Sequence, residues 1–419
     1  MKINLVVAEK CFVVSAFIMF TGGVVQLIYE MRTGRYSGGN DTEGVIDVIV
    51  ALFSIYIITF FLVILRWKQF VYALTKTKLI IFLVGMALVS ALWSVSPELT
   101  IRRSVALAAS TMFGVYFGTR YTLNEQFRLL LWTFGLAMLL SVLFALFLPS
   151  FGVHHSGGGA GLWRGIYTHK NTLGRNMGYS LFTFTLLGLW GNRYRWIGWV
   201  GCGLAVALIL LSGSVTPVFS TLTVFVVLPL YSILRWRYNL TTLFFTTVAM
   251  AYIVLSALLL SLAPILLGLF GRDLSFTGRT PLWSALLQAI PKRLWLGYGY
   301  SAFWLEQNSE ALEVFRNLNG WRPDYAHNGY LELTLSLGLL GLVVYLSDFF
   351  VNFFRTLILA AATKTAAGMF PLAFMTYMIP CNITDSIILS QNSIVWVVYV
   401  SVTLSLVLNP IQLKIIKRA

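Results

Sequence analysis

The chain has 419 residues, of which 58% are hydrophobic and 11% are charged, and its mean hydropathy is +0.80. A soluble domain needs about 25% charged residues to cover a surface that faces water, so this composition excludes a soluble globular protein. The formal net charge of +15 could favour a nucleic-acid partner. The basic residues, however, form short clusters between apolar runs without a continuous basic stripe, which argues against nucleic-acid binding.

Apolar runs of about 20 residues, long enough to cross the hydrocarbon core of a bilayer, recur along the chain. They lie near residues 9–29, 45–65, 79–94, 103–119, 129–149, 172–191, 196–212, 215–234, 241–270, 329–350, 357–380 and 387–409. The first run lacks a small-residue cleavage site and is interpreted as a retained helix. The pattern predicts an all-α, polytopic membrane protein with about 12 transmembrane helices, in which residues 1–419 form a single integral membrane domain.

Basic residues orient these predicted helices, because Lys and Arg gather in the cytoplasmic connections of membrane proteins. With the N-terminus inside, every connection on the cytoplasmic side is short and basic. The residues concerned are Arg66, Lys68, Lys76, Lys78, Arg120, Arg128, Arg193, Arg195, Arg235, Arg237, Arg355 and Lys364, and the tail carries Lys414, Lys417 and Arg418. We therefore predict that both termini are cytoplasmic.

Two long segments, 150–171 and 271–328, fall on the opposite, periplasmic face. The second contains a stretch after Trp283 that is typical of an amphipathic helix ending near Pro291, and Gly297 to Gly299 indicate a turn. Both segments are basic although topology disfavours cations there. These cations are Arg164, Lys170 and Arg175 in and beside the first segment, and Arg272, Arg279, Lys292, Arg293, Arg316 and Arg322 in the second. Their concentration indicates an anionic ligand.

His327 closes the second segment and stands where the helix predicted over 329–350 begins. The ordinary pKa of histidine, about 6.5, suits proton transfer near neutral pH. The alternative is a histidine that caps the helix or anchors it at the membrane interface. Further along, Gly338 and Gly341 would let another helix approach closely.

The first segment gathers cations, an aromatic ring and a histidine between Trp163 and Asn171. Arginine offers a forked donor set that suits phosphate, and lysine adds a point charge, so a diphosphate could be bound without a metal. The alternative is a cationic anchor that reaches lipid headgroups. His154 and His155, followed by glycines up to Gly159, indicate a flexible stretch and a poor metal site.

Ionisable residues within the predicted spans are few. Asp47, Glu332 and Asp348 all lie near predicted helix ends, where water could reach them. Because no file of acidic residues crosses the membrane, a proton-coupled transporter is not favoured.

Four motifs resemble one known family, the O-antigen ligases and the related Wzy-type polymerases of O-antigen and exopolysaccharide. His327 and Asn328, nine residues, then Gly338 to Gly341 resemble the ligase-type His-Asn-x9-Gly-x-x-Gly pattern. The run from Trp163 to Gly174 is similar to the family's Arg-Gly-x3-His-Lys-Asn-x-Leu-Gly segment. Two further stretches resemble the exopolysaccharide-polymerase branch: residues 277–283 followed by 297–299, and residues 92–97 followed by 102–103.

The resemblance implies a metal-independent glycosyltransferase of the bacterial cell inner membrane that needs no cofactor. It would transfer a glycan from an undecaprenyl-diphosphate carrier at the periplasmic face. By this resemblance His327 is catalytic or activates the acceptor, and Arg164 and Arg279 hold the diphosphate. The other expected substrate-binding residues are His169, Lys170, Asn171, Arg175 and Asn328.

The acceptor defines two related activities. A polymerase would extend a carrier-linked glycan, whereas an O-antigen ligase would use lipid A-core. Ligases carry an Arg-x3-Leu pattern, but Arg279 has Leu282 at the third position and Trp283 at the fourth, which favours the polymerase. A flippase or exporter is the third hypothesis. Besides donor, acceptor and membrane lipids, a chain-length regulator protein is a candidate partner.

Overall fold

The computed structural model describes residues 4–24, 28, 46–155, 159–191, 193–234, 279–363 and 365–408. Within these residues the fold is helical, with one isolated β-bridge between Val153 and Trp163. The helices are α1 (Leu5–Phe20), α3 (Ile46–Ile64), α4 (Trp67–Lys76), α5 (Lys78–Val89), α6 (Pro97–Arg120), α7 (Leu123–Phe147), α8 (Pro149–Gly152), α9 (Lys170–Trp190), α10 (Arg195–Ser212), α11 (Val215–Leu234), α13 (Arg279–Ala289), α14 (Ser309–Asn317), α15 (Gly329–Ala362), α16 (Ala366–Thr384) and α17 (Ile394–Leu408). Two 3-10 helices, η2 (Ser90–Leu92) and η6 (Ile290–Arg293), complete the described elements.

Five of the described helices, α3, α7, α10, α15 and α16, are long and apolar enough to cross a membrane, and α4 with α5 and η2 could form a sixth span. The remaining spans in the expected total of about 12 stay a prediction. The run at 241–270 lies outside the described residues. Helix α9 is less apolar, but Asn176, Ser180 and Thr183 on it are buried, as polar side chains are when they pack between membrane helices.

Helix α15 differs from the sequence-based expectation of one span over 329–350 and another over 357–380. It continues past residue 350 to Ala362 and spans 34 residues, while α16 begins only at Ala366. Asp348 therefore lies in the middle of a helix. It is 6% exposed and accepts a hydrogen bond of 2.6 Å from the Tyr399 hydroxyl. The expectation that water reaches Asp348 at a helix end was wrong.

Helix α4 occupies the connection that was expected to be a basic loop after α3. It is bent by 92° from the α5–η2 helix. Lys68 is exposed and Ala73 is buried, so this short helix presents an apolar side to the bundle and basic side chains away from it.

Gly338 interrupts α15 with φ +69° and ψ −171°. The break frees backbone groups that residues 294–299 take up. The amides of Tyr298 and Gly299 donate to the carbonyls of Leu335 and Ser336, at 2.7 and 3.2 Å. In return the amide of Leu339 donates to the Leu294 carbonyl at 2.7 Å. Gly338 therefore admits a turn segment and not the packed helix that the glycine pair predicted. A Cβ atom here would lie 2.2 Å from the Trp295 backbone.

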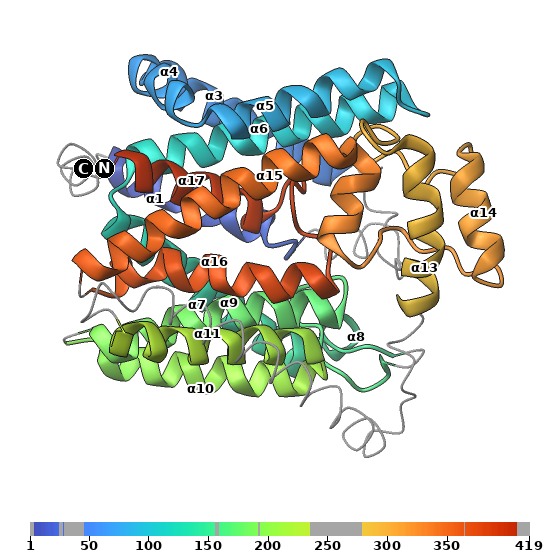
Figure 1. The fold of residues 1–419 in the computed structure, drawn as a ribbon. Coiled ribbons are helices and arrows are strands. Elements are labelled where there is room, and N and C mark those ends of the chain that lie inside the picture. Colours follow the sequence, from blue (N-terminus) through green and yellow to red (C-terminus); the bar gives the residue numbers. More distant parts are fainter. Residues whose placement is uncertain are drawn as a thin grey trace.

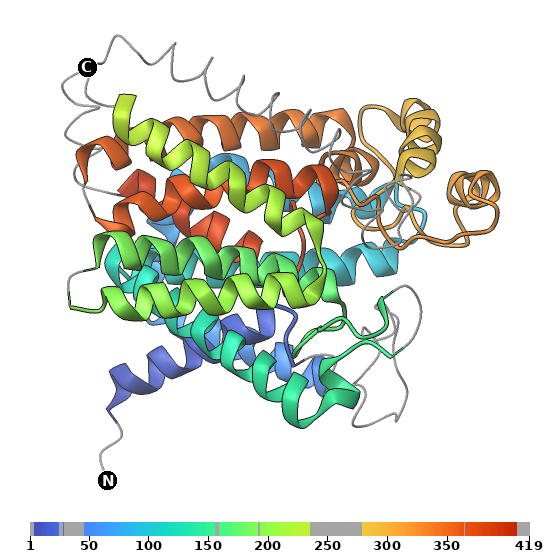
Figure 2. The same cartoon turned by 90° about the horizontal axis from the view of Figure 1, so that it is seen from below.

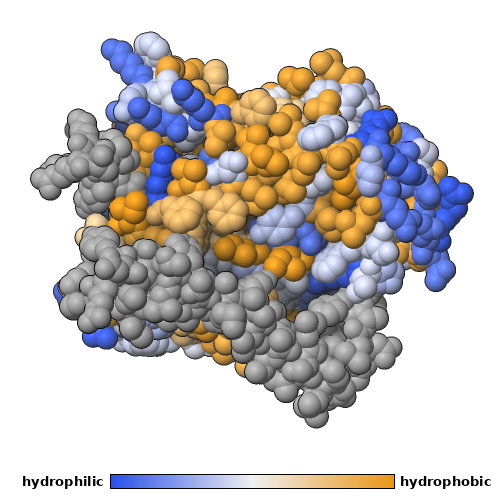
Figure 3. Space-filling model, viewed as in Figure 1, coloured by the Kyte–Doolittle hydropathy of each residue, from blue (hydrophilic) through white to orange (hydrophobic). Residues whose placement is uncertain are grey.

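The helices run side by side, and the two long connecting segments meet at one end of the bundle (Figures 1 and 2). Helices α13 and α14, in yellow and light orange, stand at that end, as does α8. Helix α1 begins and helix α17 ends at the opposite end (Figure 1). Apolar side chains cover much of the flank, whereas polar ones gather over α13 and α14 (Figure 3). The flank has large exposed side chains such as Phe53, Phe61 and Phe350, as a lipid-facing surface requires.

Candidate active site

The segment before α9 is folded tightly against the bundle. The amides of Arg164 and Gly165 both donate to the Gly152 carbonyl, at 2.8 and 3.0 Å. Arg164 is only 1% exposed, and its guanidinium donates to the Ser150 carbonyl at 3.3 Å. A ligand outside the protein could therefore reach Arg164 only after this segment moved.

His154 is ordered, which corrects the expectation of a flexible stretch at this residue. It is 6% exposed, and its Nε2 accepts a hydrogen bond of 3.0 Å from the Lys170 amide. Burial, followed by the charges of His169, Arg164 and Lys170, lowers the pKa of His154 to about 4. His154 therefore stays neutral at physiological pH and acts as a hydrogen-bond acceptor at the start of α9.

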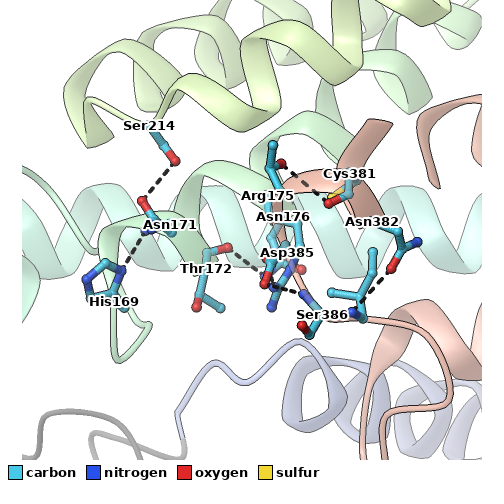
Figure 4. Close-up of polar contacts among 12 residues, drawn as sticks. His169, Asn171, Thr172, Arg175, Asn176, Ser214, Cys381, Asn382, Asp385 and Ser386 are labelled. Carbon is cyan, nitrogen blue, oxygen red and sulfur yellow. Dashed lines mark hydrogen bonds and ion pairs between the residues drawn. The ribbon is translucent and has the colours of Figure 1, made fainter. Parts of the chain in front are cut away.

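The first turn of α9 presents three of the predicted site residues. His169 is the N-cap, and its Nδ1 accepts from the Asn171 amide at 3.2 Å. The Asn171 carboxamide oxygen accepts from the Ser214 hydroxyl at 3.1 Å, so α9 is tied to the start of α11 (Figure 4). The rings of His154 and His169 meet edge to face with centroids 5.3 Å apart. An imidazole that accepts through Nδ1 carries its proton on Nε2 when neutral, so Nε2 of His169 is the ring atom left to donate.

One turn further along α9, Arg175 forms an ion pair with Asp385, the residue that follows α16 (Figure 4). Asp385 also accepts a hydrogen bond of 2.9 Å from the Ser386 amide, and the Ser386 hydroxyl accepts one of 3.1 Å from the Asn328 amide. This short loop after α16 thus connects α9 to the turn that carries His327. Sequence reasoning missed Asp385, although a carboxylate in a short connection between two apolar runs was an available signal.

His327 occupies a turn with φ +49°, a left-handed backbone conformation that few residues other than glycine adopt. Its ring lies 4.1 Å from the Tyr325 ring and 6.4 Å from the Trp321 ring, measured between centroids. The N-cap of α15 is Asn328, whose side-chain oxygen accepts from the amides of residues 330 and 331 at 3.0 and 3.1 Å. The alternative in which His327 caps the helix is therefore wrong.

The peptide groups just before His327 are held from both sides. The Ala326 amide donates to the Glu332 carboxylate at 2.7 Å, and the Ala326 carbonyl accepts from the Trp283 indole at 2.9 Å. The Trp304 indole donates to both oxygens of Glu332 at 3.1 Å. Because helices α13 and α15 and the segment before α14 all contribute, the strained turn is maintained by tertiary contacts.

The charges of this region act on one another. Burial, with the Arg279 charge next, lowers the pKa of His327 to about 4, although Asp385 opposes the shift and His169 adds to it. Burial lowers the pKa of Arg279 too, against the charge of Asp385. His327 is thus neutral at neutral pH, and its pKa lies below the ordinary value near 6.5 on which the sequence-based expectation relied.

Together, the structure brings His169, Lys170, Asn171, Arg175, Arg279, His327 and Asn328 to one end of the bundle, with Asp385 among them. This cluster, the outer-end cluster, combines two imidazoles with lowered pKa values, several cations and one carboxylate. Such a set can attract an anion, stabilise negative charge on a leaving group and accept a proton. Among the described residues, no group of three or more His, Cys, Asp or Glu side chains is arranged to hold a metal ion.

The apolar helices define the class first: this chain is a multi-pass membrane protein. A model of the O-antigen ligase family then matches residues 200–346, a stretch that includes Arg279 and His327. The exopolysaccharide production protein ExoQ of Rhizobium meliloti (strain 1021) is 26% identical over 281 residues, or 65% of this chain. The chain spans 63% of the length of that relative. These findings support the family of O-antigen ligases and related exopolysaccharide proteins, so the resemblance that the motifs indicated is confirmed.

Proposed function

We propose that the protein is a membrane glycosyltransferase that polymerises undecaprenyl-diphosphate-linked polysaccharide repeat units on the periplasmic face of the bacterial inner membrane. The observation that carries this proposal is the outer-end cluster, in which the neutral imidazole of His327 lies within the electrostatic influence of Arg279, Asp385 and His169. The match to an exopolysaccharide production protein supports the choice of substrate class.

The proposed reaction is a displacement at the anomeric carbon of the carrier-linked sugar. The acceptor hydroxyl oxygen forms the new glycosidic bond, and the bond between that carbon and the diphosphate oxygen breaks. Its electron pair goes to the diphosphate, where Arg279 and Arg175 stabilise the charge without a metal. The hydroxyl proton goes to His327, which the lowered pKa keeps ready to accept it. Asp385 then stabilises the imidazolium.

The ion pair between Arg175 and Asp385 supports a division of roles among the cations. The Asp385 carboxylate compensates the half-buried guanidinium of Arg175. An arriving diphosphate offers Arg175 a second anionic partner, so the arginine can bridge carboxylate and phosphate. His169 and Lys170 lie at the start of the same helix and would donate further hydrogen bonds to the diphosphate. The buried Arg164 would instead stabilise the segment that precedes them.

The close alternative is an O-antigen ligase, which shares the donor but uses lipid A-core as acceptor. The family description of the match over residues 200–346 favours it, whereas the spacing around Arg279 and the ExoQ relative favour the polymerase. A flippase or exporter is less favoured, because the cations and the carboxylate of the outer-end cluster lie together at one end of the bundle.

Deleting the gene in its host and separating the surface glycans on a gel tests the proposal. Loss of long chains with single repeats remaining supports the polymerase. Long carrier-linked glycan beside a bare lipid core supports the ligase. Purified protein that moved carrier-linked glycan across vesicles without forming glycosidic bonds would contradict both.

Site variants sharpen the test. His327→Ala and Asp385→Asn should reproduce the deletion phenotype at normal protein levels. Arg322→Ala is the matched control, because Arg322 belongs to the same segment but forms an exposed ion pair with Glu306. Wild-type glycan from the His327 variant would remove this residue from the mechanism.

A further inference from the structure

A groove lies at the end of the bundle opposite the outer-end cluster. It has a volume of about 960 Å³ and opens between α1, α3 and the first turn of α4. Leu5 and Phe12 of α1 line one side, and Ile58 and Leu62 of α3 line the other. The volume is at the upper end of the range of small-ligand sites, about 300–1,000 Å³, so the groove can hold a molecule with a long apolar part.

The polar residues of the groove leave a positive charge at its mouth. Glu9, its acidic residue, accepts hydrogen bonds from the Tyr116 hydroxyl at 2.5 Å and from the Arg120 guanidinium twice at 2.9 Å. Arg120 therefore compensates Glu9. The side chains of Arg66 and Lys68 also line the groove. Neither side chain donates a hydrogen bond to another described residue, although the charge of Arg66 acts on Glu9. The groove accordingly favours an occupant with a negative end.

Helix α4 fixes the depth of these two cations. Because α4 is bent by 92° from the α5–η2 helix and is amphipathic, it lies across the bundle as an interfacial helix does. Arg66 and Lys68 then stand at headgroup level. The apolar wall begins at Leu65, just after the end of α3, and follows α3 back to Ile58. This stretch covers about 10 Å at the helical rise and leads toward the middle of the bilayer.

We propose that this groove binds one anionic phospholipid. Its phosphate lies against Arg66 and Lys68, and an acyl chain lies along Ile58 and Leu62 against α1. The bilayer itself supplies this molecule. Its negative headgroup lies at the depth of the two cations, and its acyl chain lies at the depth of the apolar wall. The site is separate from the proposed catalytic cluster and does not depend on the proposed function.

Native mass spectrometry of the full chain from nanodiscs tests this site. The discs contain phosphatidylcholine with a minority of phosphatidylglycerol, and the readout is the phosphatidylglycerol that stays bound. We expect wild type to retain it in preference to phosphatidylcholine. The double variant R66A/K68A should lose affinity about fivefold for each cation removed.

Lys76→Ala is the matched control, because Lys76 is on the same helix but lies 5.1 Å over the Tyr72 ring, outside the groove. It should retain the lipid. Ile58→Trp fills the apolar wall while keeping both cations, and should also displace the lipid. Ile58 is 44% exposed, so the larger ring does not disturb the core. Equal loss in the Lys76 variant, unchanged binding in the double variant, or no lipid preference in wild type would each overturn the proposal.

Discussion

At the scale of single residues, His327 combines a strained backbone with a chemically unusual side chain. Its positive φ is maintained by the contacts of Ala326 with Glu332 and Trp283. Strain of this kind persists where surrounding structure imposes it, and it clusters at functional sites. Glycine would adopt this conformation with less strain, so the histidine at this position supports the proposed role of its ring in the reaction.

Replacing His327 by glycine should separate these two effects. Relief of the left-handed strain should make His327→Gly more stable than His327→Ala by about 1 kcal/mol, while both variants lose activity. Thermal unfolding in detergent and glycan analysis in cells measure the two effects. An active glycine variant would show that the ring has no part in the reaction.

The lowered pKa of His327 predicts a particular pH dependence. Folding favours the neutral imidazole, so between pH 6.5 and about 4 the unfolded state binds more protons than the folded state. Stability should therefore decrease as the pH falls through this window. Wild type should lose more thermal stability than His327→Gly between pH 7 and pH 5. The pKa of His154 is lowered in the same way, but this residue is present in both proteins and its effect cancels in the comparison.

The same shift affects activity. The kcat/KM of the free enzyme should not decline near pH 6.5 on account of His327, because its acidic limb lies near pH 4. A half-point near 6.5 that disappears in the His327→Gly variant would contradict the burial of this ring.

At the scale of elements, the break in α15 links the membrane helices to the outer segment. Residues 294–299 take the hydrogen-bonding places that Gly338 frees, and the Trp93 indole donates to the Leu296 carbonyl at 3.1 Å. The first turns of α15, which follow His327, are thereby joined to the segment between α13 and α14. Geometry at His327 should consequently depend on Gly338, which lies well along the same helix.

Gly338→Ala should destabilise the protein by about 2 kcal/mol or more, because alanine is strained at this φ and its Cβ meets the Trp295 backbone. Gly203→Ala in α10 is the control, since a Cβ there meets nothing within 4 Å, and it should be neutral or slightly stabilising. Thermal unfolding compares them. Equal melting temperatures for the two variants would contradict the observed break.

At the scale of the whole molecule, hydrophilic side chains gather at two ends of the face drawn in Figure 3, and an apolar flank separates them. One end carries α13, α14 and the outer-end cluster, and the other carries α4 and the groove (Figure 1). The positive-inside rule predicts that α4 lies on the cytoplasmic side. It follows that α14 should face the periplasm.

Cysteine labelling tests this orientation. In a background without the native Cys11, Cys202 and Cys381, a membrane-impermeant maleimide should label Ser309→Cys on α14 in intact spheroplasts. Gln69→Cys on α4 should react only after the membrane is opened. Labelling of both positions from the outside, or of Gln69→Cys alone, would reverse or exclude the proposed topology.

Much of the helical framework could be predicted from the sequence because partition into a bilayer depends on local runs of apolar side chains. The apolar stretches at 45–65 and 129–149 correspond closely to α3 and α7. The boundary between the spans near 350 could not be found in this way. Residues 351–356 contain Asn352 and Arg355, yet they continue α15, because Asn352 is buried by neighbouring helices and Arg355 bonds to it.

By itself, then, the sequence determined an all-helical membrane protein, its resemblance to the O-antigen ligases and related polymerases, and His327 as the residue to examine, since composition, charge and short motifs are local properties. Tertiary structure decided which distant residues meet. Asp385 reaches Arg175 across 210 positions of the chain, and Arg279 comes within electrostatic range of His327. It also decided that a turn segment fills the break at Gly338 and that burial lowers the pKa of His327. These outcomes depend on how helices pack and how deeply side chains are buried, and no local pattern encodes either quantity.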